Sequence, residues 1–332
     1  MTRLLTRKDI QSILPMESVI ELVEQAFEQQ ALKRTVMPVR SCIPIEKNNG
    51  IVCSMPAYIE SMNALGMKVV STFRDNPGKY GIPSVQATIL MNNSETGQVM
   101  AIMDGVYITG MRTAAASAIA TKHLARKDSE TLGMFGAGGQ ALYQLQGQCA
   151  VSGIKRVKVY DVNSKYRDAF VQKASKIVGE SVKVEAVDNP EQVVKGSDII
   201  VTVTTSKKPI FDGNWVEEGT HINGIGSYEP FARELDTTTI KRASKVVVDA
   251  YDAAMVEAGD VIIPIKERAV TANHVYAQLG ELVAKIKLGR TDDKEITVFK
   301  TVGTAIQDVS TAIWVYTMAK AKGIGLEFDF TV

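Results

Sequence analysis

The chain has 332 residues, which is enough for about two domains with sizeable cores. Its 38 basic and 37 acidic residues leave a formal charge of +1, so charge does not favour binding to nucleic acid or to an anionic membrane. The N-terminus has no apolar segment of signal-peptide length and no apolar run approaches membrane-spanning length, which predicts a soluble, cytoplasmic protein.

The cysteines and histidines point to no special site. Cys42, Cys53 and Cys149 are scattered and lack C-x-x-C spacing, which predicts reduced thiols in a cytosolic chain. The three histidines lie far apart, and no H-x-x-x-H or H-E-x-x-H motif occurs. No metal site is therefore expected, although distant ligands can converge in a fold.

The N-terminal third is predicted to combine helices with an antiparallel sheet. Thr6 and Pro15 are helix-start signals, and apolar residues recur at helical spacing from Val19 to Phe27, so residues 6–32 are expected to be helical. The expected strands that follow are 39–45, 51–57, 64–73, 85–91 and 98–103, with a hairpin at Asn48-Asn49-Gly50.

Two basic residues, Arg40 and Lys68, lie within these expected strands. Lys68 shares a strand face with Gly66, Val70 and Thr72, whose modest side chains suit the lining of a pocket. The alternative is that both cations point to solvent from an exposed sheet face. The residues alone leave both interpretations open.

The alanine-rich segment that ends at Leu124 is predicted to form a helix. Arg112 and Thr113 are expected near its beginning, where a guanidinium and a hydroxyl suit a phosphate or a carboxylate. An exposed first-turn arginine is the alternative, although the helix dipole slightly disfavours a cation there.

A phosphate-binding turn is predicted after the apolar run Thr131–Phe135. Gly136-x-Gly138-x-x-Ala141 fits the fingerprint that opens the first helix of a dinucleotide-binding unit. A further helix and strand lead to Asp161, which stands where a ribose-binding acid belongs. The alternatives are an ordinary glycine-rich turn and a solvated or helix-capping aspartate.

The following segments alternate strand and helix, which predicts a doubly wound, mostly parallel sheet. Thr204 and Asn223 stand at predicted strand ends, the side where such sheets bind ligands. A last helix, 303–322, carries Asp308, for which a solvated helix face is the alternative to a place in a site. The expected strands are 131–135, 156–160, 182–187, 198–204, 221–224, 245–249 and 296–299, and the expected helices are 140–151, 165–178 and 253–258.

Together these motifs resemble the ornithine cyclodeaminase and mu-crystallin family, which includes archaeal-type alanine dehydrogenases and ketimine or pyrroline-2-carboxylate reductases. The resemblance extends along the chain. The matching segments are Met37–Arg40, Met55–Tyr58, Lys68–Val70, Pro83–Thr88, Met103–Gly105, Met111–Ala115, Gly136–Ala141, Glu234–Asp236, Gly280–Leu282 and Val298–Gly303.

The resemblance implies an α/β homodimer, with a Rossmann dinucleotide-binding domain (119–305) inserted in an α+β substrate and dimerisation domain with an antiparallel sheet (1–118 plus 306–332). It also implies that Arg40, Lys68 and Arg112 gather the carboxylate of the substrate. The implied cofactor-binding residues are Ser84, Arg112, Thr113, Gly136, Gly138, Gly139, Gln140, Asp161, Thr204, Asn223 and Thr301.

One loop departs from the cyclodeaminase pattern. Ornithine cyclodeaminases carry Gly-Gly-Asp after the fifth Rossmann strand, where the aspartate is assigned as the catalytic residue. Here Tyr228 occupies that place, within Gly226-Ser227-Tyr228-Glu229-Pro230. A phenol with a pKa of about 10 cannot act as a carboxylate base, so the loop looks like those of the dehydrogenase and ketimine reductase members.

The resemblance therefore implies hydride transfer between a nicotinamide cofactor and the α-carbon of an amino or imino acid. The reaction is expected to be the reduction of a cyclic ketimine such as pyrroline-2-carboxylate to proline, or the alanine dehydrogenase reaction. Lys68 is the candidate for proton delivery and Asp308 for balancing the cations. Asp161 favours NAD(H), whereas Lys165 and Arg167 leave NADP(H) possible.

Two other functions remain as alternatives. One is an NAD-dependent ornithine cyclodeaminase that forms proline and ammonia. The other is a binding protein without turnover, like mu-crystallin. The intact glycine turn, together with Arg40, Lys68 and Arg112, favours the enzyme.

Overall fold

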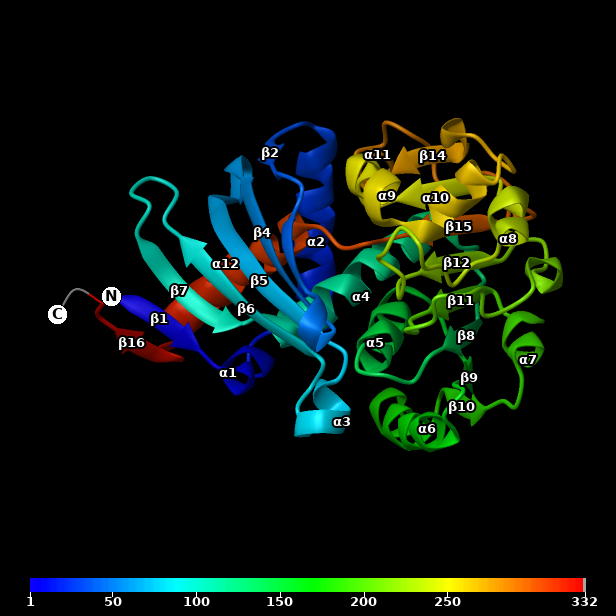
Figure 1. Cartoon of the computed structure of the whole chain (residues 1–332), viewed down its shortest axis with the longest axis horizontal. Helices are drawn as coiled ribbons and strands as arrows, with labels where there is room; N and C mark the ends of the chain where they lie inside the picture. The colour runs from blue at the N-terminus through cyan, green and yellow to red at the C-terminus, as the bar shows by residue number, and fades with distance from the viewer. Residues whose placement is uncertain (331–332) are drawn as a thin grey trace. The chain divides into compact units, whose positions relative to one another are not determined.

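The computed structural model describes residues 1–330, which divide into two compact units. Unit 1 comprises Met1–Arg112 and the C-terminal segment from Thr304, and unit 2 is Thr113–Gly303. Helix α4 (Gly105–Leu124) carries the chain from unit 1 into unit 2 (Figure 1).

Unit 1 is built on an eight-stranded sheet in the order β16-β1-β7-β6-β5-β4-β2, with β3 also paired to β4. All its pairs are antiparallel except β1 with β7. Five of these strands were predicted from the sequence, whereas β1, β2 and β16 were not. The strands are β1 (Thr2–Leu5), β2 (Thr35–Val36), β3 (Ser41–Ile45), β4 (Gly50–Ile59), β5 (Ala64–Phe73), β6 (Val85–Asn92), β7 (Val99–Asp104) and β16 (Leu326–Phe328).

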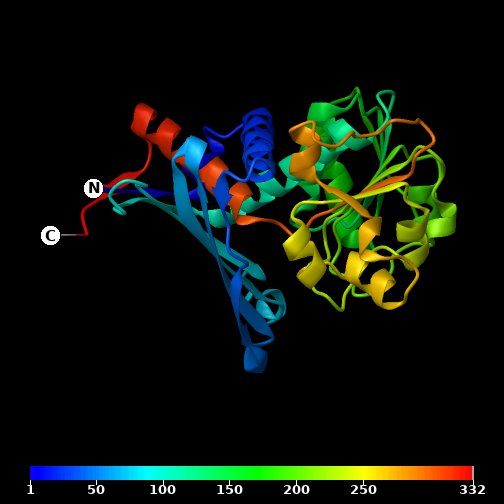
Figure 2. The ribbon, with the colours of Figure 1, turned by 90° about the horizontal axis from the view of Figure 1, so that it is seen from above.

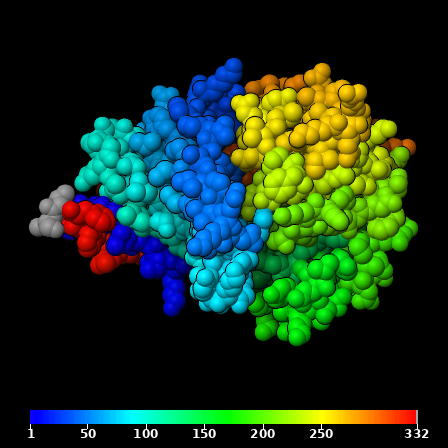
Figure 3. Space-filling view, viewed as in Figure 1, coloured from blue at the N-terminus to red at the C-terminus, as the bar shows by residue number. Residues whose placement is uncertain are grey.

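Helices α12 (Ala305–Lys322) and α2 (Met16–Ala31) form the apolar layer of unit 1. α12 packs across β4, β5 and β6 and against α2 (Figure 2). The predicted stripe on α2 is buried, and a capping box at Thr6 starts α1 (Arg7–Gln11). The short helix α3 (Asn76–Tyr80), between β5 and β6, lies in the cyan part of the surface in Figure 3.

Unit 2 is a doubly wound α/β domain, as the sequence predicted. Its sheet has the order β10-β9-β8-β11-β12-β15-β13-β14, and every pair is parallel. The strands are β8 (Thr131–Phe135), β9 (Arg156–Tyr160), β10 (Lys183–Ala186), β11 (Ile199–Thr202), β12 (His221–Gly224), β13 (Lys245–Val248), β14 (Val275–Gln278) and β15 (Thr297–Lys300). The helices are α5 (Ala141–Val151), α6 (Ser164–Val178), α7 (Pro190–Val194), α8 (Thr237–Arg242), α9 (Tyr251–Glu257), α10 (Gly259–Lys266) and α11 (Leu279–Val283).

Both faces of this sheet are buried. Ile200 belongs to one apolar cluster, while its neighbours Ile199 and Val201 belong to a second. Because successive side chains of a strand point to opposite faces, the two clusters are the two cores of a three-layer domain. Near-continuous apolar strands such as β11 follow from this double burial.

The strand order reverses direction next to β8. The chain runs from β8 outward through β9 and β10, and then returns to pair β11 with the other edge of β8. In doubly wound sheets the ligand crevice lies outside the carboxyl ends of the strands at such a switch point. The glycine turn after β8 and the segment after β11 both lie there.

Candidate active site

A buried ion-pair cluster lies in unit 1, where β5 packs against α12. Lys68 on β5 is 1% exposed, and Asp308, in the first turn of α12, is fully buried. The Nζ of Lys68 lies 2.8 Å from Oδ2 of Asp308, and Nε of Arg112 donates to Oδ1 of Asp308 over 2.9 Å. The solvent-exposed alternatives for Lys68 and Asp308 are therefore wrong.

The charges in this cluster are unevenly matched. Lys68 and Arg112 share the one Asp308 carboxylate. Burial, followed by the charge of Arg112, lowers the pKa of Lys68 to about 7, although Asp308 opposes the change. The charge of Arg40 lowers this pKa further, which puts Arg40 within electrostatic reach of Lys68. An excess of buried positive charge suits an anionic ligand such as a carboxylate.

Gln307 belongs to the same cluster, although the sequence gave no signal for it. Its Oε1 accepts a hydrogen bond from Nη1 of Arg112 over 2.5 Å. Within residues 1–330 its Nε2 is buried without a hydrogen-bond partner, and so is Oγ1 of Thr304. Buried donors without partners are costly, so these two groups suit a site that a ligand or water completes.

The positions of Arg40, Arg112 and Thr113 differ from the predicted ones. α4 begins at Gly105, so Arg112 and Thr113 lie about two turns inside it and not at its N-terminus. The argument from a helix N-terminus is therefore wrong, and the partner of Arg112 is Asp308. Arg40 precedes β3 and lies outside a strand. Ser84 lies in the bend before β6, where its carbonyl accepts from Phe73 N–H over 2.8 Å.

The predicted phosphate-binding turn connects β8 to α5. Gly136 has φ +98°, and a Cβ there would lie 2.7 Å from the carbonyl oxygen of Val203, so only glycine fits. At Gly138 and Gly139 a Cβ would meet nothing within 4 Å. Packing therefore does not explain these two glycines, whereas close approach of a phosphate would.

Asp161 and Gln140 flank this turn. The Asp161 carboxylate accepts from the backbone N–H groups of Ala137 and Asn163, each over 2.8 Å. Asn163, and not Asp161, caps α6. The Oε1 of Gln140 is buried without a partner among the described residues. The acid thus holds the turn at the place where a ribose is expected.

The three remaining cofactor candidates lie at the carboxyl edge of the same sheet. Thr204 follows β11, and its N–H and hydroxyl both donate to Glu234. Asn223 in β12 is fully buried, and its Nδ2 donates to Oγ1 of Thr121 over 3.0 Å. Thr301 follows β15, and its hydroxyl donates to Asp249.

Four buried charged residues at this edge were given no role in the sequence analysis: Glu234, Asp249, Asp260 and Lys300. Each is fully buried. The signal available was a charged residue within or directly after an apolar run, as in Val-Val-Val-Asp249 and Val-Phe-Lys300. Such a residue is either paired in the core or near a site.

The prediction of reduced thiols is wrong for two cysteines. Cys42 on β3 and Cys53 on β4 form a disulfide bridge, with Cα atoms 4.1 Å apart. The antiparallel register places them directly opposite each other, which their spacing in the sequence does not reveal. Cys149 is a free thiol, and burial raises its pKa to about 11.

Within residues 1–330, no three or more His, Cys, Asp or Glu side chains form a group that could hold a metal ion. In the same range, no helix has the length and apolar character to cross a membrane.

The chain is similar to known proteins over nearly its whole length. The model of the ornithine cyclodeaminase/mu-crystallin family matches residues 1–323. An alanine dehydrogenase of Archaeoglobus fulgidus is 39% identical over 99% of this chain and 98% of its own. The structure of Thermococcus litoralis Δ1-pyrroline-2-carboxylate reductase in complex with NADH and L-proline is 43% identical, with a TM-score of 0.96 over 98% of this chain and 100% of that one.

An archaeal alanine dehydrogenase dimer with bound NAD is also similar. Its TM-score is 0.93 at 38% identity, over 99% of both chains. The predicted family is thus confirmed, and the chain belongs to the ornithine cyclodeaminase/mu-crystallin family.

Proposed function

We propose that the protein is an NAD(H)-dependent oxidoreductase that acts on the C–N bond of a small amino or imino acid. The observation that carries the proposal is the buried cluster of Lys68, Arg112 and Asp308, which pairs two cations with one carboxylate. The names of the similar proteins, alanine dehydrogenase and Δ1-pyrroline-2-carboxylate reductase, support the same reaction class.

Unit 2 would hold the cofactor. The open space at Gly138 and Gly139 fits the pyrophosphate, and Asp161 fits the ribose hydroxyls. When bound, the nicotinamide supplies or accepts a hydride. The proposed contacts along the rest of the cofactor are Ser84, Arg112, Thr113, Gly136, Gln140, Thr204, Asn223 and Thr301.

NADH is proposed as the preferred cofactor. The Asp161 carboxylate would repel the 2′-phosphate of NADPH. Arg167 is already committed, because its Nε pairs with Asp168 at 3.0 Å and its Nη1 donates to the carbonyl of Val187 over 3.1 Å. A higher kcat/KM with NADH than with NADPH is expected, and a clear preference for NADPH would contradict the role of Asp161.

Unit 1 would hold the substrate. Arg40 and Arg112 would bind its carboxylate and fix the C=N carbon in a near-attack geometry. Reduction adds a hydride to that carbon and a proton to the nitrogen. Lys68 suits the proton transfer, because its pKa of about 7 lets it gain and lose a proton near neutral pH. Asp308 would fix the Lys68 ammonium and limit the positive charge of the empty site.

A substrate panel tests the proposal. NADH oxidation would be followed with pyrroline-2-carboxylate, piperideine-2-carboxylate, and pyruvate plus ammonia. We expect turnover of at least one of them, and the fastest identifies the branch of the family. Proline and ammonia formed from ornithine without net NADH would establish a cyclodeaminase instead, and no turnover on any substrate would favour a binding protein.

We also propose that the protein is a homodimer. Several large apolar side chains of the unit 1 sheet region, Val36, Val39, Ile43 and Val69, are exposed in the single chain. Burial of such side chains is a common source of dimer stability. The similar archaeal alanine dehydrogenase is itself described as a dimer. Light scattering on the purified protein should give twice the 36.1 kDa chain mass, and a monomer would contradict the proposal.

A further inference from the structure

A second buried ionic cluster lies in unit 2, at the carboxyl ends of β11, β12 and β15. Lys300, the last residue of β15, is fully buried, with its Nζ 2.8 Å from Oδ2 of Asp260. The same ammonium donates to the carbonyl of Ser227. The other oxygen of Asp260, Oδ1, accepts from the backbone N–H groups of Glu234 and Leu235 over 2.7 and 2.8 Å.

Glu234 is the centre of this cluster. Its Oε1 accepts from one residue after β11, through the N–H and the hydroxyl of Thr204, over 2.6 and 2.7 Å. Its Oε2 accepts from the hydroxyl of Thr202, at the end of β11, over 2.8 Å and from the N–H of Gly226, after β12, over 2.7 Å. Two of these donors are backbone N–H groups, one on each oxygen, so both oxygens of Glu234 must accept. Burial raises the pKa of Glu234, and the charge of Lys300 opposes this rise.

The Glu234 carboxylate joins two chain segments that nearly touch. A Cβ on Gly226 would lie 2.2 Å from the carbonyl oxygen of Thr204 and 2.6 Å from Oε1 of Glu234, so no larger residue fits there. The segment after β11 and the loop after β12 are therefore packed backbone to backbone. The N–H groups of Thr204 and Gly226 both donate to the Glu234 carboxylate. Lys300 donates to the carbonyl of Ser227, which follows Gly226.

Burying this cluster costs more free energy than a purely structural role would justify. Three ionisable side chains are removed from water, and replacing such groups by apolar residues is often neutral or stabilising. The carboxyl edge is also where doubly wound sheets bind their ligands, and Thr204 is a proposed cofactor contact. The joined loop continues to Tyr228.

We propose that Glu234, fixed by Asp260 and Lys300, is a positioning residue for the oxidoreductase reaction. It holds Thr204 and the Gly226–Tyr228 loop in the arrangement that receives the cofactor. This inference rests on the proposed function and adds residues that the sequence motifs left without a role.

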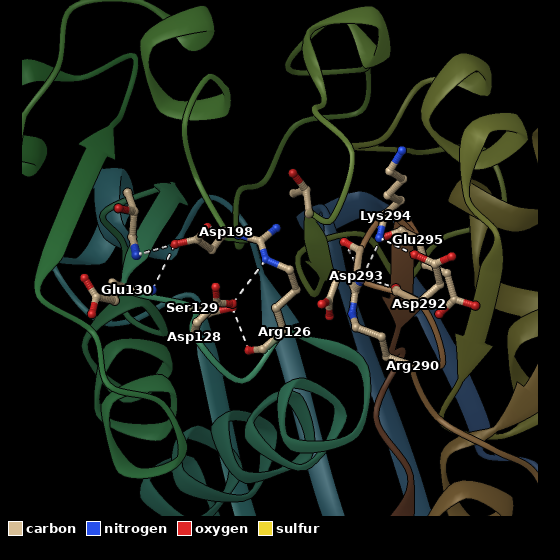
Figure 4. Close-up of polar contacts among 12 residues, drawn as sticks. Arg126, Asp128, Ser129, Glu130, Asp198, Arg290, Asp292, Asp293, Lys294 and Glu295 are labelled. Carbon is tan, nitrogen blue, oxygen red and sulfur yellow. Dashed lines mark hydrogen bonds and ion pairs between the residues drawn. The ribbon is translucent and has the colours of Figure 1, made fainter.

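The test compares Glu234→Gln with a matched variant at the opposite edge of the same sheet. In Glu234→Gln the amide NH2 must face the N–H of either Thr204 or Gly226, so one segment is pushed away. Asp198 at the amino edge resembles Asp260: it accepts from the N–H groups of Glu130 and Thr131 and pairs with Arg126 (Figure 4). Asp198→Asn should therefore lower the Tm without touching the carboxyl edge.

The measurements are the Kd for NADH by fluorescence, KM and kcat with the best substrate, and the Tm. We expect Glu234→Gln to raise the Kd and KM for NADH by about 10-fold or more, on the scale of a lost hydrogen bond to a charged group. Asp198→Asn should stay within about twofold of wild type in both, while losing Tm. Equal NADH affinity in the two variants would overturn the inference, because a structural role would move only the Tm.

Two further readouts keep the test decisive. If Glu234→Gln does not fold, Thr202→Val removes one of its four donors at nearly constant volume, and the KM for NADH should still rise about threefold. An unchanged KM in Thr202→Val would then count against the inference. Wild-type protein that fails to bind NADH would contradict the proposed function itself, which separates that failure from the failure of the positioning role.

Discussion

Two buried lysine–aspartate pairs, Lys68–Asp308 and Lys300–Asp260, have the same 2.8 Å separation and are almost equally shielded from water. Their surroundings differ. Lys68 shares its aspartate with Arg112, so positive charge is in excess, whereas the second pair adjoins the Glu234 carboxylate, whose oxygens are filled by protein donors. Burial of an ion pair is therefore not the mark of a substrate site. The first pair leaves positive charge in excess for an anionic substrate, whereas at the second the Glu234 oxygens are already filled by protein donors.

The largest effect should come from Lys68→Ala. Removing the proposed proton donor is expected to lower kcat/KM for imine reduction at least 100-fold, on the scale usual for acid–base groups. Lys158→Met is the control, since Lys158 is also buried on a strand but donates to the carbonyl of Lys195, away from the proposed substrate site in unit 1. It should keep kcat/KM within about threefold of wild type. Near-wild-type reduction by Lys68→Ala would refute the assignment.

Replacing the aspartate of each lysine–aspartate pair should show how the two pairs differ. Asp308→Asn leaves Lys68 and Arg112 unpaired in the core and should lower the free energy of unfolding by about 3–5 kcal/mol. Added acetate should restore part of this loss, because the cations bind it in the folded state. Asp260→Asn should also destabilise the fold, but acetate should not restore it, since Glu234 remains nearby. Equal responses to acetate in denaturant titrations would remove the distinction.

The pH dependence of stability gives a smaller signal for each pH unit. The pKa of Lys68 is about 7 in the folded chain and 10.5 when unperturbed, so the unfolded chain binds more protons between these values. The free energy of unfolding should therefore rise with pH in this window, by up to about 1.4 kcal/mol per unit, and should not change below it through this group. Lys68→Met should lack this rise, and parallel curves for the two proteins would contradict the lowered pKa.

The smallest predicted effect concerns ligand affinity. As pH rises through about 7, Lys68 loses its charge and the site loses part of its attraction for anions. Binding of a carboxylate without a basic nitrogen, such as pyrrole-2-carboxylate, should weaken several-fold in titration calorimetry. An affinity that does not change with pH would show that Arg40 and Arg112 alone attract the carboxylate.

The sequence predicted what depends on local pattern. The bounds of β5, β8, β9 and β12 follow from apolar periodicity and flanking turns, and the glycine fingerprint located the phosphate-binding turn. Partners that come from distant segments could not be predicted this way. The contact of Arg112 with Asp308 joins residues 196 positions apart, and the four donors around Glu234 come from the end of β11, the segment after it and the loop after β12.

The start of α4 shows a further limit. Alanine content identified the helix but not its first residue, because the start signal of Asp104, whose Oδ1 accepts from the N–H of Tyr107 over 2.8 Å, was missed. Two glycines, Gly105 and Gly110, make the first stretch a weak helix former by itself. Its helical state therefore depends on packing in the fold, and the misplaced start led to the wrong environment for Arg112.

The bridge between Cys42 and Cys53 closes a loop that begins only two residues after Arg40. An oxidised bridge limits the freedom of the chain that carries this arginine. If Arg40 holds the substrate carboxylate, the redox state of the two thiols and the affinity for substrate are thermodynamically linked. Substrate would then favour the oxidised bridge by the same free energy by which the bridge favours substrate.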